Sequence, residues 1–300
     1  MADPIAILVT GGAGQVGAEL IAHAWPAGVT ILAPSRAELD LTDAASVTAW
    51  FAAHKVAAVI NPAAYTAVDR AETEVGAAFA ANALAPALLA EATKAASIPL
   101  VHVSTDYVFD GQGDGFNAED APVAPLGVYG ASKLAGELAV RSGNPRSVVV
   151  RTAWVLSPHR GNFLKTMLRL AGDRDRISVV ADQFGCPTSA RDIAQALATI
   201  TLRMIADPDA PTGVYHFVNA GETSWSGLAE EIFAQSARRG GASAEVTPIT
   251  TADYPTPARR PANSRLSTTK ITADYGVEPR PWRGAVAEIV EELSNRSVAS

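Results

Sequence analysis

The sequence has a single cysteine, Cys186, and this scarcity excludes an internal disulfide framework. The five histidines do not join that cysteine at the spacing of zinc ligands, so no metal site is expected. We expect a reduced, cytoplasmic protein in which Cys186 fills a small buried space.

A surplus of positive charge is also missing. The chain has 24 lysines and arginines against 31 acidic residues, a net charge of -7 and a pI near 5.3. Nucleic acid needs a dense cationic surface, so we expect no nucleic-acid partner. A single diphosphate can still be held by a few cations or by helix amides.

The beginning of the chain, MADPIAILVT, lacks a basic segment ahead of a long apolar one. Its hydrophobic run is far too short to span a bilayer. We therefore expect neither secretion nor a membrane partner.

Short apolar runs alternate with alanine-rich segments that have helical periodicity. This alternation is typical of βαβ units and predicts an α/β fold with a doubly wound parallel sheet of the Rossmann type. The ends of these runs also carry helix start signals, at Asp43 and Ser224, and a last helix is predicted over 282–294. The six predicted strands are IAILVT, TILAPS, AAVINPA, PLVHVST, SVVVRTA and VYHFVN.

The alternation loosens after about Arg151, where proline-rich stretches begin. We therefore predict a smaller C-terminal substrate-binding domain. The predicted division is an NAD(P)-binding Rossmann domain over 1–154, with 177–219 returning to its sheet and including a strand at 177–180, and a substrate-binding domain formed by 155–176 and 220–300.

A glycine-rich turn follows the first strand, with Gly11, Gly14 and Gly17 spaced as Gly-x-x-Gly-x-x-Gly. The first two glycines allow a tight turn and close approach of the backbone to a pyrophosphate, and Gly17 allows close packing of the next helix. The helix N-terminus then faces the phosphates. Its position between strand and helix favours dinucleotide binding over a plain structural turn.

The end of the second strand reads Ser35-Arg36, where NAD-specific folds commonly place an acid. An arginine suits the 2′-phosphate of NADPH, which is the expected cofactor. Glu38 and Asp40 lie close by, so use of NADH stays open, as does a solvated Arg36.

The candidate catalytic group is Thr105, Tyr129 and Lys133. Tyr129 and Lys133 are four residues apart at the start of a predicted helix, so both project from one face. A lysine ammonium lowers the pKa of a nearby phenol, which makes the tyrosine a usable acid and base. Tyr129 can protonate a carbonyl oxygen while hydride reaches its carbon, and Thr105 can polarise the same carbonyl. Lys133 can also hold the nicotinamide ribose.

These motifs resemble the extended short-chain dehydrogenase/reductases, and within them the dTDP-4-dehydrorhamnose reductase family. The resemblance covers nearly the whole chain, in the strings GGAGQVG, LDLTD, INPAAYTAVDRAE, STDYVFDG, YGASKLAGE, RTAWVL, NFLKTMLRLA, DQFGCPT, YHFVNAGETSW and YPTPARRPANSRL. It implies NADPH-dependent reduction of the C4 ketone of dTDP-4-dehydro-6-deoxy-L-mannose (dTDP-4-dehydro-β-L-rhamnose) to dTDP-L-rhamnose, the last step of dTDP-rhamnose biosynthesis. A dTDP-sugar would be the substrate partner.

The resemblance also implies roles for residues at matching positions. Thr105, Tyr129 and Lys133 would be catalytic. The cofactor would be lined by Gly14, Gln15, Val16, Asp40, Leu41, Ala63, Ala64 and Tyr65, in addition to Gly11, Ser35, Arg36, Tyr129 and Lys133. The sugar nucleotide would meet Val68, Thr105, Asp106, Tyr107 and Trp154. For Trp154 the alternative is a core aromatic, and for Arg259 and Arg260 a phosphate contact or plain solvation are both open. Asn263 and Ser264 have no assigned contact.

One departure concerns a Mg²⁺ site through which some family members dimerise. Glu19 and Glu292 match two of its acidic positions, but Arg191 stands at the third. A cation there opposes Mg²⁺ and can form salt bridges to both glutamates. Mg²⁺ is therefore doubtful, and a homodimer is one open possibility.

Three rival functions stay open to different degrees. Dehydratases of related architecture need a glutamate where Tyr107 follows Asp106, so elimination is disfavoured. The regulatory subunit of methionine adenosyltransferase shares this architecture and binds NADP without known turnover, but the complete Thr105, Tyr129 and Lys133 set favours catalysis. A reductase of another nucleotide 4-ketosugar would use the same residues, because pocket shape decides the sugar.

Overall fold

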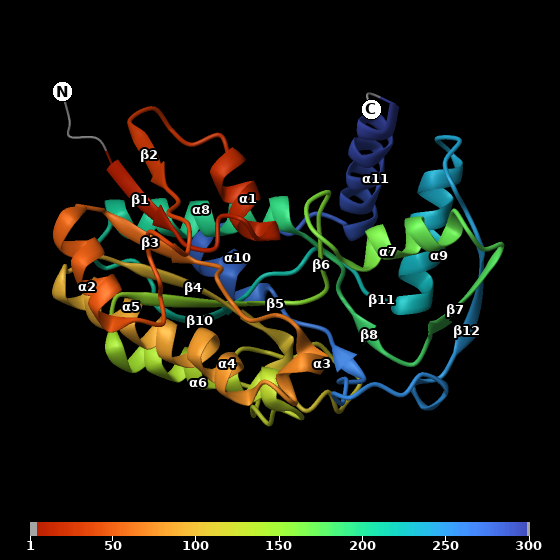
Figure 1. The fold of residues 1–300 in the computed structure, drawn as a ribbon, viewed down its shortest axis with the longest axis horizontal. Helices are drawn as coiled ribbons and strands as arrows, with labels where there is room; N and C mark the ends of the chain where they lie inside the picture. Colours follow the sequence, from red (N-terminus) through yellow and green to blue (C-terminus); the bar gives the residue numbers. More distant parts are fainter. Residues whose placement is uncertain (1–4, 299–300) are drawn as a thin grey trace.

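The computed structural model describes residues 5–298, and a six-stranded parallel sheet is its largest element (Figure 1). The strand order is β10-β5-β4-β3-β1-β2, so the chain winds outward in both directions from its first strand. These are the six strands predicted from the apolar runs. Their bounds are β1 Ile5–Val9, β2 Val29–Leu32, β3 Ala58–Asn61, β4 Leu100–Thr105, β5 Ser147–Thr152 and β10 Gly213–His216.

Both faces of this sheet are buried, which explains why its strands are continuous apolar runs. Ile7 and Val9 face one hydrophobic core, and Leu8 between them faces the other. The first face is covered by α1 (Gln15–Ala22) and α8 (Ala190–Ala206), which pack on each other. The opposite face is covered by α2 (Ala44–Ala53), α5 (Ala85–Ala95) and α6 (Val128–Gly143).

The helix start signals are confirmed. Asp43 caps α2 by accepting a hydrogen bond from the Ala45 amide at 2.9 Å, and Ser224 caps α9 (Trp225–Ala237) through the Gly227 amide at 3.1 Å. The final helix, α11 (Trp282–Val298), is one turn longer than predicted.

The rest of the chain packs short strands and three helices around a second hydrophobic core, beside the end of the large sheet (Figure 1). The strand predicted at 177–180 does not return to the large sheet. It is β7 (Arg176–Val180), which pairs in parallel with β12 (Glu245–Ile249). The segment 177–219 therefore rejoins the large sheet only through β10, and the division into two domains stays a prediction.

The remaining elements complete the second half and the connections. They are α3 Val68–Ala71, α4 Val75–Phe79, the π-helix η1 Ala80–Leu84, η2 Asp106–Val108, β6 Val155–Leu156, α7 Phe163–Ala171, β8 Phe184–Gly185, β9 Thr188–Ser189, β11 Thr223–Ser224, η3 Thr251–Asp253, β13 Asn263–Ser264 and α10 Thr269–Tyr275.

One continuous helical run, Val75–Ala95, is long and apolar enough to cross a membrane by length and composition. It comprises α4, η1 and α5, and its η1 and α5 segments pack against α6. Leu89 and Ala90 on this run belong to the core under the large sheet. Its place in the α/β layer buries about a third of this apolar run, while Val75, Phe79 and Leu84 are exposed.

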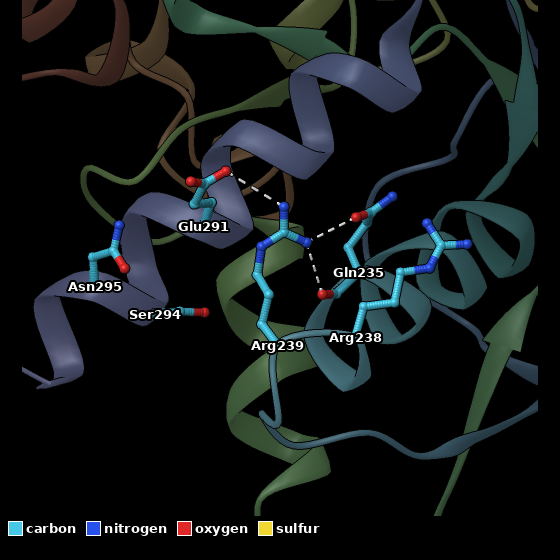
Figure 2. A pocket seen from close by; sticks show the side chains of 6 residues that line it. All are labelled: Gln235, Arg238, Arg239, Glu291, Ser294 and Asn295. Carbon is cyan, nitrogen blue, oxygen red and sulfur yellow. Dashed lines mark hydrogen bonds and ion pairs between the residues drawn. The ribbon is translucent and has the colours of Figure 1, made fainter.

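A surface hollow of about 570 Å³ lies between α9 and α11, away from the sheet edge (Figure 2). Arg239 reaches across it, donating to the Gln235 side chain at 2.9 Å and lying 3.4 Å from the Glu291 carboxylate. Its charge is compensated there, and no sequence motif falls on this hollow.

Candidate active site

The glycine-rich turn has the geometry that the sequence predicted. Gly11 has a φ of +59°, and a side chain there would meet the Cα of Ala63 at 2.9 Å. A Cβ on Gly17 would lie 2.2 Å from the Gly11 carbonyl oxygen, so only glycine allows this closeness of turn and helix.

The first turn of α1 is prepared for an anion. Its N-cap residue is Gly14, which has no side chain to bond the free amides, and the turn contains no acidic residue. Uncapped amides and the positive end of the helix dipole favour a phosphate group. The turn therefore fits a dinucleotide pyrophosphate. Of the next two predicted residues, Val16 is buried in the core and Gln15 projects away from it.

The side chains predicted to meet the adenosine end lie at the surface after β2. Arg36 is 82% exposed and lies 3.6 Å from the Asp40 carboxylate. Hydrogen bonds from Thr42 lower the pKa of Asp40. The Glu38 carboxylate accepts from the Ser35 amide at 2.7 Å, so it closes this turn instead of projecting freely, and Leu41 is half-buried beyond it.

The segment Ala63–Tyr65 after β3 is held by a residue that the sequence reasoning missed. Asn82, fully buried in the π-helix η1, accepts from the Tyr65 amide at 2.8 Å and donates to its carbonyl at 3.0 Å. It also contacts the Ser132 hydroxyl on α6 at 3.0 Å. π-helical turns are frequent at functional sites, but their sequence signal is weak. Asn82 thus ties the predicted cofactor segment to the helix of Tyr129 and Lys133.

Thr105 ends β4 and is buried with its neighbour Asp106. The Thr105 hydroxyl donates to the Asp106 carboxylate at 2.9 Å and accepts from the Tyr107 amide at 3.2 Å. Burial raises the pKa of Asp106 to about 6, against the opposing contacts of Ser264 and Thr105. This carboxyl is therefore partly protonated near neutral pH.

Tyr129 and Lys133 lie on one face of α6, as predicted; Lys133 is buried and Tyr129 is half-buried. The Lys133 ammonium donates to the Val103 carbonyl of β4 at 2.7 Å, and burial lowers its pKa to about 8. The Tyr129 ring packs edge-on against Tyr107, with ring centroids 5.4 Å apart.

The expected lowering of the Tyr129 pKa is wrong for this structure. Burial raises that pKa, and a contact with the Thr105 hydroxyl opposes the rise only in part. The reason is that desolvation penalises a phenolate, while the Lys133 ammonium is directed to the Val103 carbonyl. Tyr129 is consequently held as a neutral phenol, the form that can donate a proton.

Of the residues predicted to meet the sugar nucleotide, Tyr107 is linked through Arg260 to the helix that begins at Val68. The Tyr107 hydroxyl accepts from Arg260 at 3.0 Å, and Arg260 also pairs with Asp69 at 2.7 Å, next to Val68 at the start of α3. Arg260 therefore has two protein partners, and a quarter of its side chain is exposed.

Trp154 lies just beyond β5 and has the rare positive φ of 49°. Its ring stacks on Trp225 at 3.6 Å, and Gly185 has no side chain where the indole lies. Trp154 is half-buried, so a sugar-nucleotide contact and a role as a core aromatic both stay open. Asn263 is buried and donates to the carbonyls of Gly113 and Gly115, which holds the loop ahead of α6.

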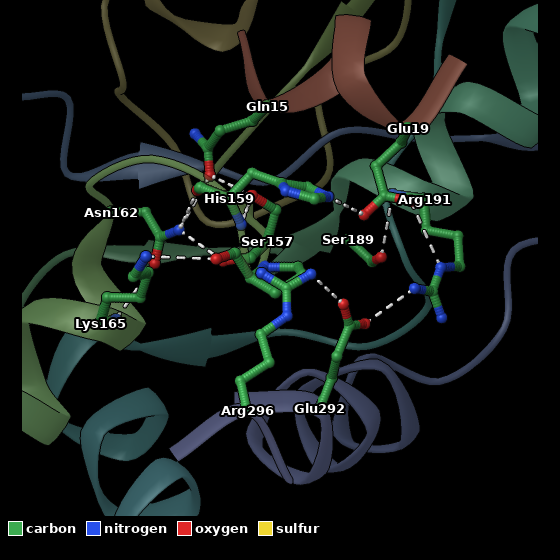
Figure 3. Close-up of polar contacts among 11 residues, drawn as sticks. Gln15, Glu19, Ser157, His159, Asn162, Lys165, Ser189, Arg191, Glu292 and Arg296 are labelled. Carbon is green, nitrogen blue, oxygen red and sulfur yellow. Dashed lines mark hydrogen bonds and ion pairs between the residues drawn. The ribbon is translucent and has the colours of Figure 1, made fainter. Parts of the chain in front are cut away.

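The acidic pair Glu19 and Glu292 is bridged by Arg191, as its charge suggested (Figure 3). Arg191 lies 3.4 Å from the Glu19 carboxylate and 2.9 Å from that of Glu292, while His159 lies 3.4 Å from Glu19. Within residues 5–298, no group of three or more His, Cys, Asp or Glu side chains is arranged to hold a metal ion.

Cys186 has the buried position expected of it, and His102 is a second buried residue with a structural role. His102 is fully buried in β4, where its Nδ1 contacts Asn61 at 3.0 Å. Cys186 is also fully buried, and burial raises the pKa of its thiol to about 11. A thiol in this state is a poor nucleophile.

This fold, with a half-buried tyrosine and a buried lysine one helical turn apart at the edge where the glycine-rich turn lies, defines the class of extended short-chain dehydrogenase/reductases. A family model described as "RmlD substrate binding domain" matches residues 5–295. The chain belongs to this family, which confirms the resemblance seen in the sequence.

Relatives named dTDP-4-dehydrorhamnose reductase match almost end to end. The protein of Burkholderia thailandensis is 44% identical over 295 residues, which is 96% of this chain and 98% of the relative. That of Sinorhizobium fredii is 42% identical over 288 residues, or 96% and 97% of the two chains.

Two solved structures have the same fold. The reductase of Clostridium acetobutylicum has a TM-score of 0.90 and 35% identity, with 96% of this chain and 99% of that chain covered. The reductase of Bacillus anthracis, solved with NADP, has a TM-score of 0.88 and 32% identity at the same coverage.

Proposed function

We infer that this protein is an NADPH-dependent reductase that converts the C4 ketone of dTDP-4-dehydro-6-deoxy-L-mannose into the alcohol of dTDP-L-rhamnose. The observation that carries the proposal is the neutral, half-buried Tyr129 phenol beside Thr105, at the sheet edge that also holds the uncapped N-terminus of α1. The named relatives support the sugar nucleotide and the reaction. NADH is the alternative cofactor, and a cytoplasmic location and a homodimer stay predictions.

The proposed chemistry adds a hydride and a proton across one carbonyl bond. Reduced nicotinamide, when bound, supplies the hydride. The Tyr129 phenol gives its proton to the ketone oxygen, and its raised pKa keeps that proton available beforehand. For Lys133, one turn along the same helix, to stabilise the phenolate that forms, its ammonium has to turn from the Val103 carbonyl toward the phenol oxygen.

Thr105 has a separate role in this proposal. Its hydroxyl is fixed between Asp106 and the Tyr107 amide, so it stays at the end of β4 beside the phenol. To bond the ketone oxygen as negative charge develops, the hydroxyl has to turn its single proton from the Asp106 carboxylate to that oxygen. Asp106 and Tyr107, the two residues that bond this hydroxyl, would form part of the sugar site.

The test is Tyr129→Phe with enzymatically generated dTDP-4-dehydrorhamnose and NADPH, followed by nicotinamide absorbance and by NMR of the sugar. We expect kcat to fall by about 10²–10⁴-fold with nearly unchanged NADPH affinity, because only the proton donor is lost. Unchanged turnover would refute Tyr129 as the donor. Tight NADPH binding without turnover of any nucleotide 4-ketosugar by the unsubstituted protein would favour a non-catalytic NADP-binding subunit.

A further inference from the structure

The loop between β6 and α7 lies directly against the glycine-rich turn. The Gln15 side-chain oxygen, on the first turn of α1, accepts hydrogen bonds from Ser157 and Asn162, both at 2.9 Å (Figure 3). The Arg160 Nε donates to the Ala13 carbonyl at 2.6 Å. Three contacts therefore fix this loop of the second half beside the expected pyrophosphate site.

The glycine-rich turn has no positive side chain of its own. Residues 10–17 contain no lysine or arginine. The helix N-terminus supplies only about half an elementary charge, whereas a pyrophosphate is negative on both phosphates. A cation delivered from outside the turn would complete the charge balance.

Arg160 is placed to be that cation. Its backbone has a φ of +54°, which non-glycine residues rarely adopt. The side chain is exposed, and Nε is engaged by Ala13. Across the described residues 5–298, its two terminal nitrogens have no hydrogen-bond or ion-pair partner.

We propose that Arg160 is a further cofactor-binding residue, whose guanidinium, anchored on the Ala13 carbonyl, binds the dinucleotide pyrophosphate. This inference rests on the proposed NADPH-dependent function. An arginine is suited to the task because two parallel N–H groups can bond phosphate oxygens together. Arg160 and Arg36 then serve different phosphates, the pyrophosphate and the 2′-phosphate.

That division gives a test by direct binding without any sugar, using NADPH, NADH and adenosine 2′-monophosphate. Arg160→Gln is expected to weaken NADPH and NADH by about tenfold each, and to leave adenosine 2′-monophosphate unchanged because it has no pyrophosphate. Arg36→Ala should weaken NADPH and adenosine 2′-monophosphate but not NADH. Arg160→Lys should recover part of the loss, since it keeps the charge and loses the fork.

The matched control is Lys165→Gln, which removes a positive charge on α7 whose ammonium is bonded to Pro158 of the same loop. Its dinucleotide affinities should stay within about twofold of the starting values. The proposal is overturned if Arg160→Gln leaves the affinities for both dinucleotides unchanged. It is also overturned if Arg160→Gln weakens adenosine 2′-monophosphate equally, as the loss of a purely structural contact would, or if Lys165→Gln has the same effect as Arg160→Gln.

The two proposals fail separately. Unaltered dinucleotide binding with no reduction of any ketosugar would reject the proposed reaction and leave the assignment of Arg160 standing. A starting protein that binds neither dinucleotide would reject both.

Discussion

Two clusters of arginine and glutamate hold different parts of this molecule together. In one, Arg151 on β5 and Glu137 on α6 form a two-pronged pair at 2.9 and 2.7 Å, with side chains only 4% and 2% exposed. In the other, Arg191 joins Glu19 to Glu292, and its own side chain is 54% exposed.

The difference in burial gives the two clusters different consequences. Charges inside a protein lose their hydration, so a buried pair must have complete geometry, and a partner left alone is costly. Glu137 lies one turn beyond Lys133, so this pair sets where α6 presents the catalytic candidates. Exposed charges are screened by water and salt and contribute little. In the Arg191 cluster the arginine is exposed but Glu19 is only 6% exposed, so replacing Arg191 leaves that carboxylate with His159 as its remaining charged partner.

The largest expected effect comes from Arg151→Met, which leaves the Glu137 carboxylate buried and unpaired. We expect the free energy of unfolding in urea to fall by about 3–5 kcal/mol. The double substitution Arg151→Met with Glu137→Leu should recover most of this loss, because no buried charge remains. A single variant as stable as the starting protein would contradict the importance assigned to burial.

His216 adds a pH dependence to the buried cluster. Its Nε2 lies 3.4 Å from Arg151, and burial followed by the Arg151 charge lowers its pKa from 6.5 to about 3. An unfolded histidine takes up a proton below about pH 6.5 and the folded one does not. The stability from His216 is thus complete above pH 6.5 and lost as the pH falls toward 3, by at most about 1.4 kcal/mol per unit.

The measurement is urea unfolding at about pH 7.5 and about pH 5.5. His216→Asn should show a smaller difference between the two than the starting protein. Burial also places the pKa of His102 well below its usual value, so some acid sensitivity should persist in the variant. Equal differences in both proteins would show that His216 is not held neutral.

The sequence predicted those features that depend on local pattern. Six strands, the glycine-rich turn and the helix of Tyr129 and Lys133 are each specified by residues close in the chain. The pairing of β7 with β12 was missed, because the two strands are more than 60 residues apart in the chain. Their alternation of apolar and polar residues is common to half-exposed strands and does not identify a partner strand.

The candidate site was predicted in composition but not in its electrostatics. The pKa of Tyr129 depends on how deeply α6 packs and on where Lys133 directs its ammonium. The contacts of Asn82 and Arg160 join segments distant in sequence, and neither residue type stands out by itself. Such properties come from tertiary packing and have no periodic signal.

The smallest expected effect belongs to the exposed cluster. Arg191→Ala should lower the free energy of unfolding by about 1 kcal/mol, with a smaller difference at high salt. The loss stays this small only because His159 remains 3.4 Å from the buried Glu19 carboxylate. Arg191→Glu should cost somewhat more, because it places a third carboxylate beside Glu19 and Glu292. Mg²⁺ should then raise the Tm of that variant, since hard cations bind clustered carboxylates.

Arg203→Glu is the matched control, since Arg203 is also on α8 and pairs with a single carboxylate, Asp207, at 2.9 Å. We expect it to lose a similar small amount of stability without a response to Mg²⁺. The starting protein should not respond either, because the guanidinium of Arg191 occupies the space between the two glutamates. Stabilisation of the starting protein by Mg²⁺ would show that the arginine does not replace the ion. The Arg191 cluster would then be a metal site as well as a set of ion pairs, unlike the pair of Arg151 and Glu137.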